Sequence, residues 1–522
     1  MMRKTAFLRT VALCLLAVMC LGSCGGEPTP SAVTTDTPAT TESPATTAAP
    51  EPMPEPIILC EDGASPYRIV ISTTATKYEK NAADLVQQYF LALTGIRLPI
   101  VSDQQERIDT EIVVGNTKRD KYSGISVNRT VAEDALIHEE DSYRLVASRQ
   151  RIFLYCLGDK DRNSTNRGTV YAAYRFIEDV LQFSIVYDRI TENYKDLSFD
   201  RVVVPGDLDI ESSSKSLSGA HIVDYPGETV MYMLPQADTS TQIGASMILK
   251  TADGKIMVID GGYMGELDSI TAAVKALTPE GKAPTIDAWV ITHLHEDHAD
   301  ALLWYISRME AKLDVGGLVI KEIWGHIMSK EWYEKANLAA YTDRGEILRN
   351  PPAPMKYVQL EKDQKIQFGD AEIEVLYVGM DNITTIMNNT SVVLKVTADK
   401  KSMVLLADAE TLAGTMLIRK CTPAQLKADA VQIGHHGTVN VGKDVYQAIG
   451  AEIYLWPVTH KWWYCDDGTG LGTINAQYGT FDAMTLTRKW LLDLKVPMEN
   501  IFFSFKGISA YHFNSGKTEY IS

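Results

Sequence analysis

Three histidines and an aspartate stand within six positions near the middle of this 522-residue sequence: His293, His295, Asp297 and His298. They follow the apolar run 289–292, which predicts a buried strand, and open α/β sheets place their sites at the carboxyl ends of strands. In an extended backbone His293 and His295 project to the same side, so both can bind one ion. Asp297 and His298 lie past the turn and can face a second ion. One loop therefore offers ligands for two metal ions.

The pattern His-x-His-x-Asp-His resembles the metal loop of the metallo-β-lactamase superfamily, and other motifs of that superfamily occur in its order. Residues 258–262 look like the aspartate-glycine turn that precedes the loop, which gives Asp260 a supporting role. Asp408 ends the apolar run 404–407 and is similar to the bridging aspartate. The resemblance covers residues 215–522, including a His-His-Gly run that is similar to the final histidine motif.

The resemblance implies two ligand sets that share one carboxylate. The first is Asp297, His298, Asp408 and His435; the second is His293, His295 and Asp408. A shared carboxylate offsets the repulsion between two divalent cations. Imidazole and carboxylate ligands suit zinc, with manganese as the alternative. Two such ions acidify a water near neutral pH and stabilise both the attacking and the leaving oxygens at phosphorus.

One departure from the superfamily's pattern concerns the second ion. The usual middle histidine has no clear counterpart, and the run Asn-Asn-Thr-Ser at residues 388–391 occupies that interval. The run resembles the branch of DNA-uptake competence proteins and related extracellular phosphoesterases. Asn389 could bind a metal weakly, hydrogen-bond a phosphoryl group or shape a turn. The candidate catalytic residues are Asp297, His436 and Asn389, with His436 beside the metals or at the substrate phosphate.

The elements around these motifs predict an α/β protein whose C-terminal region is an αββα sandwich. Strands are expected at 230–234, 246–250 and 255–259, and helices at 267–277 and 300–309. Two sheets would pack face to face, with helices outside and the site loops along one edge. The resemblance to the metallo-β-lactamase superfamily implies that the aromatic run 456–464 borders this site.

Residues 57–210 have an α/β pattern of their own, including a helix over 79–93 that ends before Gly95. The segments 93–99, 111–115 and 167–171 resemble the small N-terminal domain of α-glucuronidases and β-hexosaminidases, in which a catalytic barrel follows. No barrel pattern follows here, so the resemblance implies a fold only. A docking or spacing module is the favoured interpretation, and a carbohydrate is a possible partner.

The start of the chain is typical of an exported lipoprotein. Residues 1–23 carry three basic residues and then a short apolar run, the arrangement of a signal peptide. Leu-Gly-Ser-Cys resembles a bacterial lipobox, which implies lipid attachment at Cys24 and anchorage on the extracellular face of the cell membrane. Residues 24–56 are rich in Thr, Pro and Ala and predict an extended tether. The four remaining cysteines are scattered, which favours buried thiols over a disulfide framework.

The net charge of the chain limits the classes of substrate to be expected. The chain has a net charge of −17, which becomes −20 if the three basic residues of 1–23 are removed. A long polyanion would be repelled, and no Lys/Arg cluster flanks the motifs, so a small or cell-surface phosphodiester is favoured over long nucleic acid. Two alternatives remain open: a metal-dependent hydrolase of amides, lactones or thioesters, and a non-catalytic surface binding or adhesion lipoprotein.

Overall fold

The computed structural model describes residues 54–119, 141–157, 167–182, 199–212, 218–236, 243–380, 384–466, 468 and 480–521. All of these described residues belong to one compact unit. The predicted signal peptide, Cys24 and nearly all of the predicted tether lie outside the described residues. None of the helices in these ranges has both the length and the apolar character needed to cross a bilayer. The division into regions near residues 210–215 stays a prediction.

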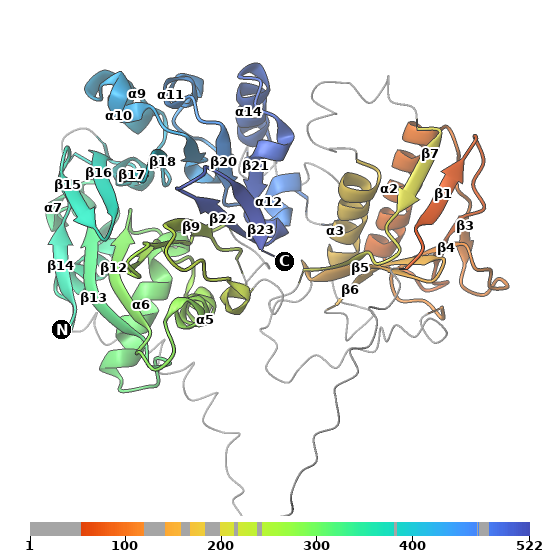
Figure 1. The fold of residues 1–522 in the computed structure, drawn as a ribbon, viewed down its shortest axis with the longest axis horizontal. Helices are drawn as coiled ribbons and strands as arrows, with labels where there is room; N and C mark the ends of the chain where they lie inside the picture. Colours follow the sequence, from red (N-terminus) through yellow and green to blue (C-terminus); the bar gives the residue numbers. More distant parts are fainter. Residues whose placement is uncertain are drawn as a thin grey trace, which may run out of the picture. The chain divides into compact units, whose positions relative to one another are not determined.

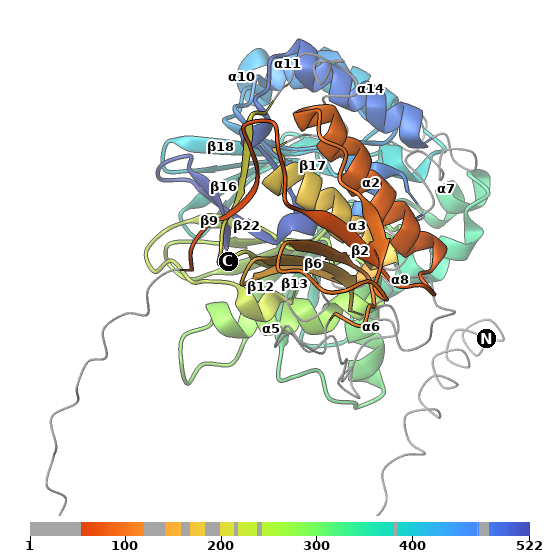
Figure 2. The ribbon, with the colours of Figure 1, turned by 90° about the vertical axis from the view of Figure 1, so that its right-hand side faces the viewer.

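The N-terminal region is built on a six-stranded sheet in the order β3-β2-β4-β6-β5-β8. Figure 2 labels two of these strands, β2 and β6. Its strands are β2 Arg68–Ile71, β3 Ile100–Ser102, β4 Glu111–Val114, β5 Tyr143–Ser148, β6 Arg151–Cys156 and β8 Asp209–Ser212. Its helices are α2 Lys77–Thr94 and α3 Arg167–Arg175, the latter continued by the π-helical turn Phe176–Val180. A separate pair joins β1 Ile57–Glu61 and β7 Arg201–Val204.

Helix α2 illustrates how local sequence sets an element's bounds. The Thr76 hydroxyl accepts from the Glu79 amide while the Glu79 carboxylate accepts from the Thr76 amide, which satisfies two free donors at the helix start. Gly95 ends the helix with φ 72°, a left-handed conformation that favours glycine. The predicted helix at 79–93 therefore matches the observed one to within two residues at each end.

Two large sheets form the C-terminal region (Figure 1). The first has the order β14-β13-β12-β11-β10-β9-β22-β23, with bounds β9 Val230–Met233, β10 Met247–Lys250, β11 Ile256–Ile259, β12 Thr285–Ile291, β13 Val319–Gly325, β14 Lys356–Gln359, β22 Ile508–His512 and β23 Thr518–Ile521. The second has the order β15-β16-β17-β18-β19-β20-β21, with bounds β15 Lys365–Phe368, β16 Ala371–Tyr377, β17 Val393–Ala398, β18 Lys401–Leu405, β19 Ala430–Gln432, β20 Ile453–Trp456 and β21 Ile501–Phe503.

Helices cover the outer face of each sheet. The first sheet carries α5 Leu267–Leu277 and α6 Glu296–Glu310, followed along the chain by α7 Lys330–Lys335 and α8 Thr342–Arg349. The second carries α9 Thr411–Lys420, α10 Pro423–Leu426, α11 Lys443–Ile449 and α14 Thr480–Asp493, with α12 His460–Tyr464 after β20. Side chains of both sheets meet in one apolar core, which includes Met257, Val290 and Leu394. The predicted αββα sandwich is confirmed.

The sheet order gathers the motif-bearing loops. Strands β11 and β12 are parallel neighbours in the first sheet, and β18 and β19 are parallel neighbours in the second. Asp260, the His293 loop, Asp408 and the His435 loop each follow the carboxyl end of one of these strands. Helix α6 begins at Glu296, earlier than the predicted 300, so Asp297 and His298 belong to its first turn. The positive end of the helix dipole favours a carboxylate at that position.

Candidate metal centre

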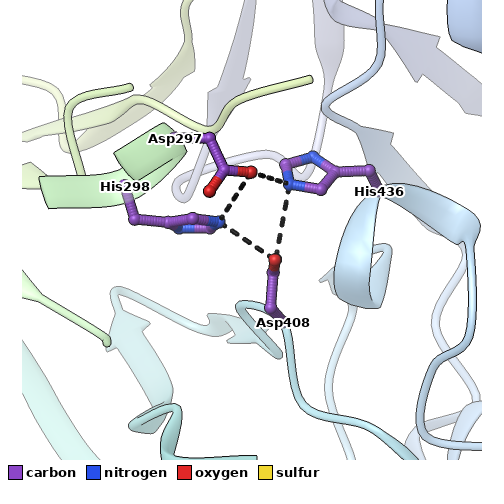
Figure 3. Close-up of side chains that lie close together, drawn as sticks. All are labelled: Asp297, His298, Asp408 and His436. Atoms are coloured by element: carbon purple, nitrogen blue, oxygen red, sulfur yellow. Dashed lines mark ion pairs between the residues drawn. The ribbon is translucent and has the colours of Figure 1, made fainter. Parts of the chain in front are cut away.

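Four side chains from three loops converge at the edge of the sandwich (Figure 3). One potential ligand atom from each of Asp297, His298, Asp408 and His436 lies within 4.8 Å of the others. The His298 Nε2 is 3.1 Å from the Asp408 Oδ2, and the His436 Nε2 is 3.4 Å from the Asp297 Oδ2 and 3.5 Å from the Asp408 Oδ1. We call these residues the four-residue group.

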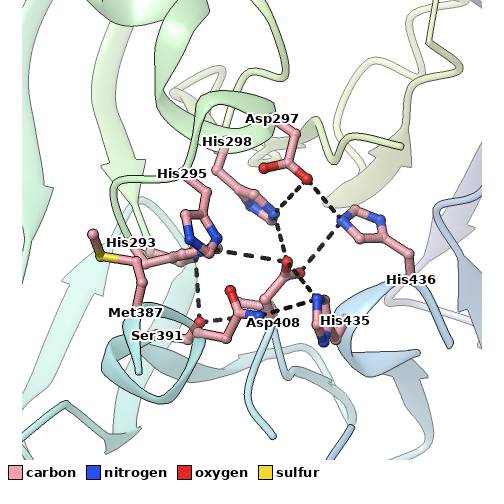
Figure 4. A network of polar contacts seen from close by, with 12 residues as sticks. His293, His295, Asp297, His298, Met387, Ser391, Asp408, His435 and His436 are labelled. Atoms are coloured by element: carbon pink, nitrogen blue, oxygen red, sulfur yellow. Dashed lines mark hydrogen bonds and ion pairs between the residues drawn. The ribbon is translucent and has the colours of Figure 1, made fainter. Parts of the chain in front are cut away.

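A second set, the three-residue group, consists of His293, His295 and Asp408 and lies beside the first (Figure 4). The His293 Nε2 is 3.1 Å from the His295 Nδ1 and 3.8 Å from the Asp408 Oδ2. Asp408 belongs to both groups, as expected of a bridging carboxylate. Three protein ligands with an open position are typical of catalytic rather than structural zinc sites.

Asp260 orients His298 from behind. Its carboxylate accepts hydrogen bonds from the Thr292 amide at 2.9 Å, from the Thr292 hydroxyl at 2.8 Å and from the His298 Nδ1 at 2.8 Å. With Nδ1 held by Asp260, His298 presents its Nε2 toward Asp408. A carboxylate behind a ligating imidazole is a common device for setting the tautomer and the ring orientation.

The structure brings His436, rather than His435, into the four-residue group. The His436 Nδ1 donates to the Pro457 carbonyl at 2.8 Å, which leaves its Nε2 facing the two aspartates. The His435 Nδ1 donates to the Val439 carbonyl, and its Nε2 accepts from the Asn388 amide at 3.1 Å. The sequence prediction placed His435 among the ligands and His436 beside the metals or at the substrate. The His435 Nε2 does lie 3.8 Å from the Asp408 Oδ2, slightly farther than the His436 Nε2 at 3.5 Å from the Asp408 Oδ1. Metal binding itself stays a prediction for all of them.

Asn389 is held by structural contacts. Its side-chain oxygen accepts from the Ala413 amide at 3.1 Å, its amide group contacts Glu410 at 3.3 Å, and its carbonyl accepts from the Tyr377 hydroxyl at 2.8 Å. These contacts agree with the turn interpretation, and the proposed catalytic role remains untested. Ser391 lies closer to the metal groups, where its hydroxyl accepts from the Asp408 amide and is 3.5 Å from the His293 Nδ1.

Backbone strain gathers at the site loops. Asp260, Ala407, His435 and His436 have φ values of 55°, 48°, 44° and 54°, in the left-handed region that non-glycine residues seldom adopt. Such conformations cost free energy and persist where the surrounding structure enforces them, as at functional sites.

The charges and unpaired atoms of the four-residue group fit a bound cation. Burial opposes the charge on the Asp408 carboxylate, but His298 and His436 outweigh that effect and hold its pKa well below its usual range. Burial also opposes the charge on His436, yet Asp408 and Asp297 raise its pKa to about 9. The His298 Nε2, the His436 Nε2 and the Asp408 Oδ1 are buried without hydrogen-bond partners. Because such atoms are costly to bury, a divalent ion among them would satisfy all three.

The histidines of the three-residue group differ in charge from His436 of the four-residue group. Burial, reinforced by His298, lowers the pKa of His293 well below its ordinary value, and burial also lowers the pKa of His295. Both are therefore neutral near pH 7, the state in which imidazole binds a metal. His295 is the more exposed of the two, and its ring lies 6.0 Å from that of Tyr341.

Several residues near the site were not found from the sequence. The Tyr341 hydroxyl donates to Glu296 at 3.1 Å, and Arg344 pairs with Asp300 at 2.5 Å and with Glu296 at 3.5 Å. Tyr341 and Arg344 carry no motif and reach the site only through the fold. Glu410 could have been suspected, because it stands two positions after Asp408.

His326 follows strand β13 but lies outside both groups, with its Nδ1 2.8 Å from the Leu360 carbonyl. The aromatic run 456–464 was expected to border the site, and its first two residues, Trp456 and Pro457, do contact His436. The aromatic side chains of Trp456, Trp463 and Tyr464 are buried. The four cysteines described are free thiols.

Comparison with known proteins identifies the central part of the chain. Residues 241–447 match the sequence model of the Metallo-beta-lactamase superfamily. This part of the chain is therefore a metallo-β-lactamase superfamily domain. Together with the His/Asp clusters, the domain indicates a metal-dependent hydrolase. No curated protein matches the chain.

Solved structures with similar folds share little sequence with this chain. The metallo-beta-lactamase fold protein YhfI from Bacillus subtilis is 14% identical over 54% of this chain and 99% of its own, with a TM-score of 0.32. CmlA, a diiron beta-hydroxylase from Streptomyces venezuelae, is 13% identical over 53% of each chain, with a TM-score of 0.29. A mutant of a metallo-beta-lactamase from Cronobacter sakazakii is 14% identical over 52% of this chain and 93% of its own, with a TM-score of 0.25.

Proposed function

We propose that this protein is an exported, membrane-anchored hydrolase that uses two divalent metal ions to cleave a phosphodiester at the cell surface. The observation that carries the proposal is the position of Asp408, which belongs to two adjacent sets of potential ligands. Two ions at these sets, zinc or else manganese, would supply an activated water and would stabilise both the attacking and the leaving oxygens at phosphorus.

The protein's own residues prepare the site for that reaction. Asp260 and the Pro457 carbonyl hold the protons of His298 and His436 on Nδ1, so both Nε2 atoms point inward. Asp297 is the most exposed member of the four-residue group, with a side-chain exposure of 19%. Its carboxylate can accept the proton that a water releases on attack.

The charge around the site supports a small substrate over a long polyanion. Glu296, Asp300 and Glu410 surround the metal groups, and the nearby Arg344 is already paired with two of these carboxylates. Phosphate contacts along nucleic acid depend on rows of lysine and arginine. The three-residue group, with one imidazole fewer than the superfamily's pattern, leaves room for a substrate oxygen, which supports phosphoester cleavage over lactam cleavage.

The experiment is elemental analysis combined with a substrate panel on the wild type and on His295→Ala. We expect two bound metal ions and phosphodiester turnover in the wild type, and about one ion with strongly reduced turnover in the variant. A β-lactam, a lactone and a thioester assayed in parallel test the alternative hydrolase activities. A wild-type protein that binds no metal would contradict the proposal and support a binding or adhesion role.

The cellular location is a separate proposal. We infer lipid attachment at Cys24 and a tether over 24–56, so the enzyme would act on the outer face of the membrane. Expression of the full chain and of Cys24→Ser in a bacterial host, followed by membrane fractionation and labelling with radioactive palmitate, tests it. We expect labelled, membrane-bound protein for the wild type only. Equal distribution of both proteins would overturn the anchor.

A further inference from the structure

The segment after β20 contacts the metal centre at one end. The Pro457 carbonyl accepts the proton of the His436 Nδ1 at 2.8 Å, and the Trp456 Nε1 donates to the His436 carbonyl at 2.7 Å. A carbonyl oxygen only accepts hydrogen bonds, so this contact assigns a proton to Nδ1 and leaves Nε2 as the atom that can bind a metal ion. The position of the Pro457 carbonyl therefore decides where the His436 Nε2 points.

The loop that carries His436 depends on the same strand. His435 and His436 adopt consecutive left-handed conformations, which require support from neighbouring groups. A Cβ atom at Gly437 would lie 2.1 Å from the Trp456 indole, so the loop packs directly against this ring. Residues 456 and 457 thus hold both the backbone and the imidazole of His436.

The other end of the segment is buried against the N-terminal region. Helix α12 begins at His460, whose Nε2 is 3.0 Å from the Tyr143 hydroxyl and whose ring stacks on Tyr171 with centroids 5.4 Å apart. Tyr464 ends the helix and stacks on Tyr174 at 4.1 Å, and its hydroxyl donates to Glu178 at 2.8 Å. His460 and Tyr464 are 3% and 0% exposed. A loosely attached spacer would not bury such side chains.

Asp466, at the end of the segment, makes two more contacts with helix α3. Its carbonyl accepts from the Tyr171 hydroxyl at 3.0 Å, and its carboxylate accepts from the Tyr174 hydroxyl. Asp466 is completely buried, so these hydrogen bonds are shielded from water and costly to break. The chain from Trp456 to Asp466 is therefore held at the metal centre and at helix α3.

We propose that the N-terminal region helps to position a ligand of the metal centre. Tyr143 and Tyr171 contact α12 and thereby fix the Pro457 carbonyl. The Pro457 carbonyl in turn orients the His436 imidazole toward the metal. His460 is the positioning residue, because it is the side chain that the N-terminal region encloses. The inference rests on the proposed function only in requiring that the four-residue group binds a metal. It gives the N-terminal region a role beyond docking or spacing.

The test compares His460→Ala with Val113→Ala. Val113 is a buried residue of β4 in a separate small apolar cluster, so its truncation loosens the N-terminal region without touching the segment 456–466. Zinc affinity is measured on the full chain by competition with a chromogenic chelator, and the ligand geometry by the visible spectrum after substitution with cobalt. Loss of a partner that orients a ligand typically weakens metal binding by about 10–100-fold.

We expect His460→Ala to lower the affinity for one of the two zinc ions by about tenfold or more, because His436 loses its fixed orientation. For the same reason the cobalt spectrum should change. Val113→Ala should change neither. Wild-type affinity and spectrum in a folded His460→Ala would overturn the inference, as would equal losses in both variants. If His460→Ala does not fold, the double variant Tyr143→Phe/Tyr171→Phe, which removes only hydroxyl groups, is measured under the same criteria. A wild type that binds no zinc would instead refute the proposed function.

Discussion

The two ligand groups share Asp408 but are prepared to different degrees. In the four-residue group, His298 and His436 each have a hydrogen-bond acceptor behind Nδ1, a carboxylate in one case and a peptide carbonyl in the other. In the three-residue group, the Nε2 of His293 faces the Nδ1 of His295, and His295 is partly exposed. The difference teaches that metal affinity depends on what holds the far nitrogen of each imidazole. We expect the four-residue group to bind its ion more tightly.

Substitution of the shared ligand should have the largest effect. In Asp408→Ala both groups lose the carboxylate that they share, so the repulsion between the two cations would no longer be offset at that position. We expect loss of both ions and a fall in turnover of about 1,000-fold or more, the size expected when several kcal/mol of metal stabilisation disappear. Metal analysis and phosphodiester assays measure both. Full metal-dependent turnover in the variant would show that the two groups do not share a ligand.

The adjacent histidines give the next largest contrast. His436→Ala removes a member of the four-residue group, so we expect loss of one ion and a fall in turnover of about 100-fold or more. His435→Ala removes a side chain whose nitrogens are already bonded to Val439 and Asn388, and we expect less than about tenfold. Both variants are assayed with metal titration. The reverse order would restore the assignment made from the sequence.

Asp260→Asn tests the orienting carboxylate itself. Asparagine keeps the shape but replaces one acceptor oxygen with an amide donor, which disturbs the proton on the His298 Nδ1. We expect the ion of the four-residue group to bind about 10–100-fold more weakly. The ion of the three-residue group should change less. Stepwise zinc titration followed by calorimetry separates the two ions, and an equal loss at both would erase the distinction drawn between the groups.

The smallest expected effect concerns His460, the first residue of α12, and its contribution to the stability of the fold. Burial lowers the pKa of His460 well below its usual 6.5, and the cations of Arg175 and Lys506 act in the same direction. Tyr143, Tyr171 and Phe505 also face this ring. The folded state keeps His460 neutral while the unfolded chain takes up a proton below pH 6.5. Its contribution to stability is therefore full above pH 6.5 and is lost as the pH falls.

Urea denaturation of the metal-free protein at several pH values measures this contribution. The free energy of unfolding should fall by about 1.4 kcal/mol for each pH unit below 6.5 owing to this one proton. His460→Gln, which has no proton to gain, should show a correspondingly flatter dependence. Parallel curves for the two proteins would mean that His460 is not buried as a neutral ring.

Much of the fold could be predicted from the periodicity of apolar residues and from the residues that end helices and strands. Helix α5 was predicted with the bounds that it has, Leu267–Leu277, because its apolar residues recur at helical spacing. The strands before Asp260 and Asp408 were recognisable as apolar runs that end in polar residues. The start of α6 was missed, because Asp297 and His298 were interpreted as ligands in a loop rather than as part of a first helical turn.

The sequence by itself determined the fold class and the set of residues from which the metal centre is drawn, because residue type and spacing are local properties. Only the tertiary structure decided that His436, of two neighbouring histidines, joins Asp297, His298 and Asp408 in one group. That choice depends on left-handed backbone angles at His435 and His436 and on the contacts of His436 with Trp456 and Pro457. The tertiary structure also decided that α12 is buried against the N-terminal region, because contacts between residues some 300 positions apart leave no local pattern in the sequence.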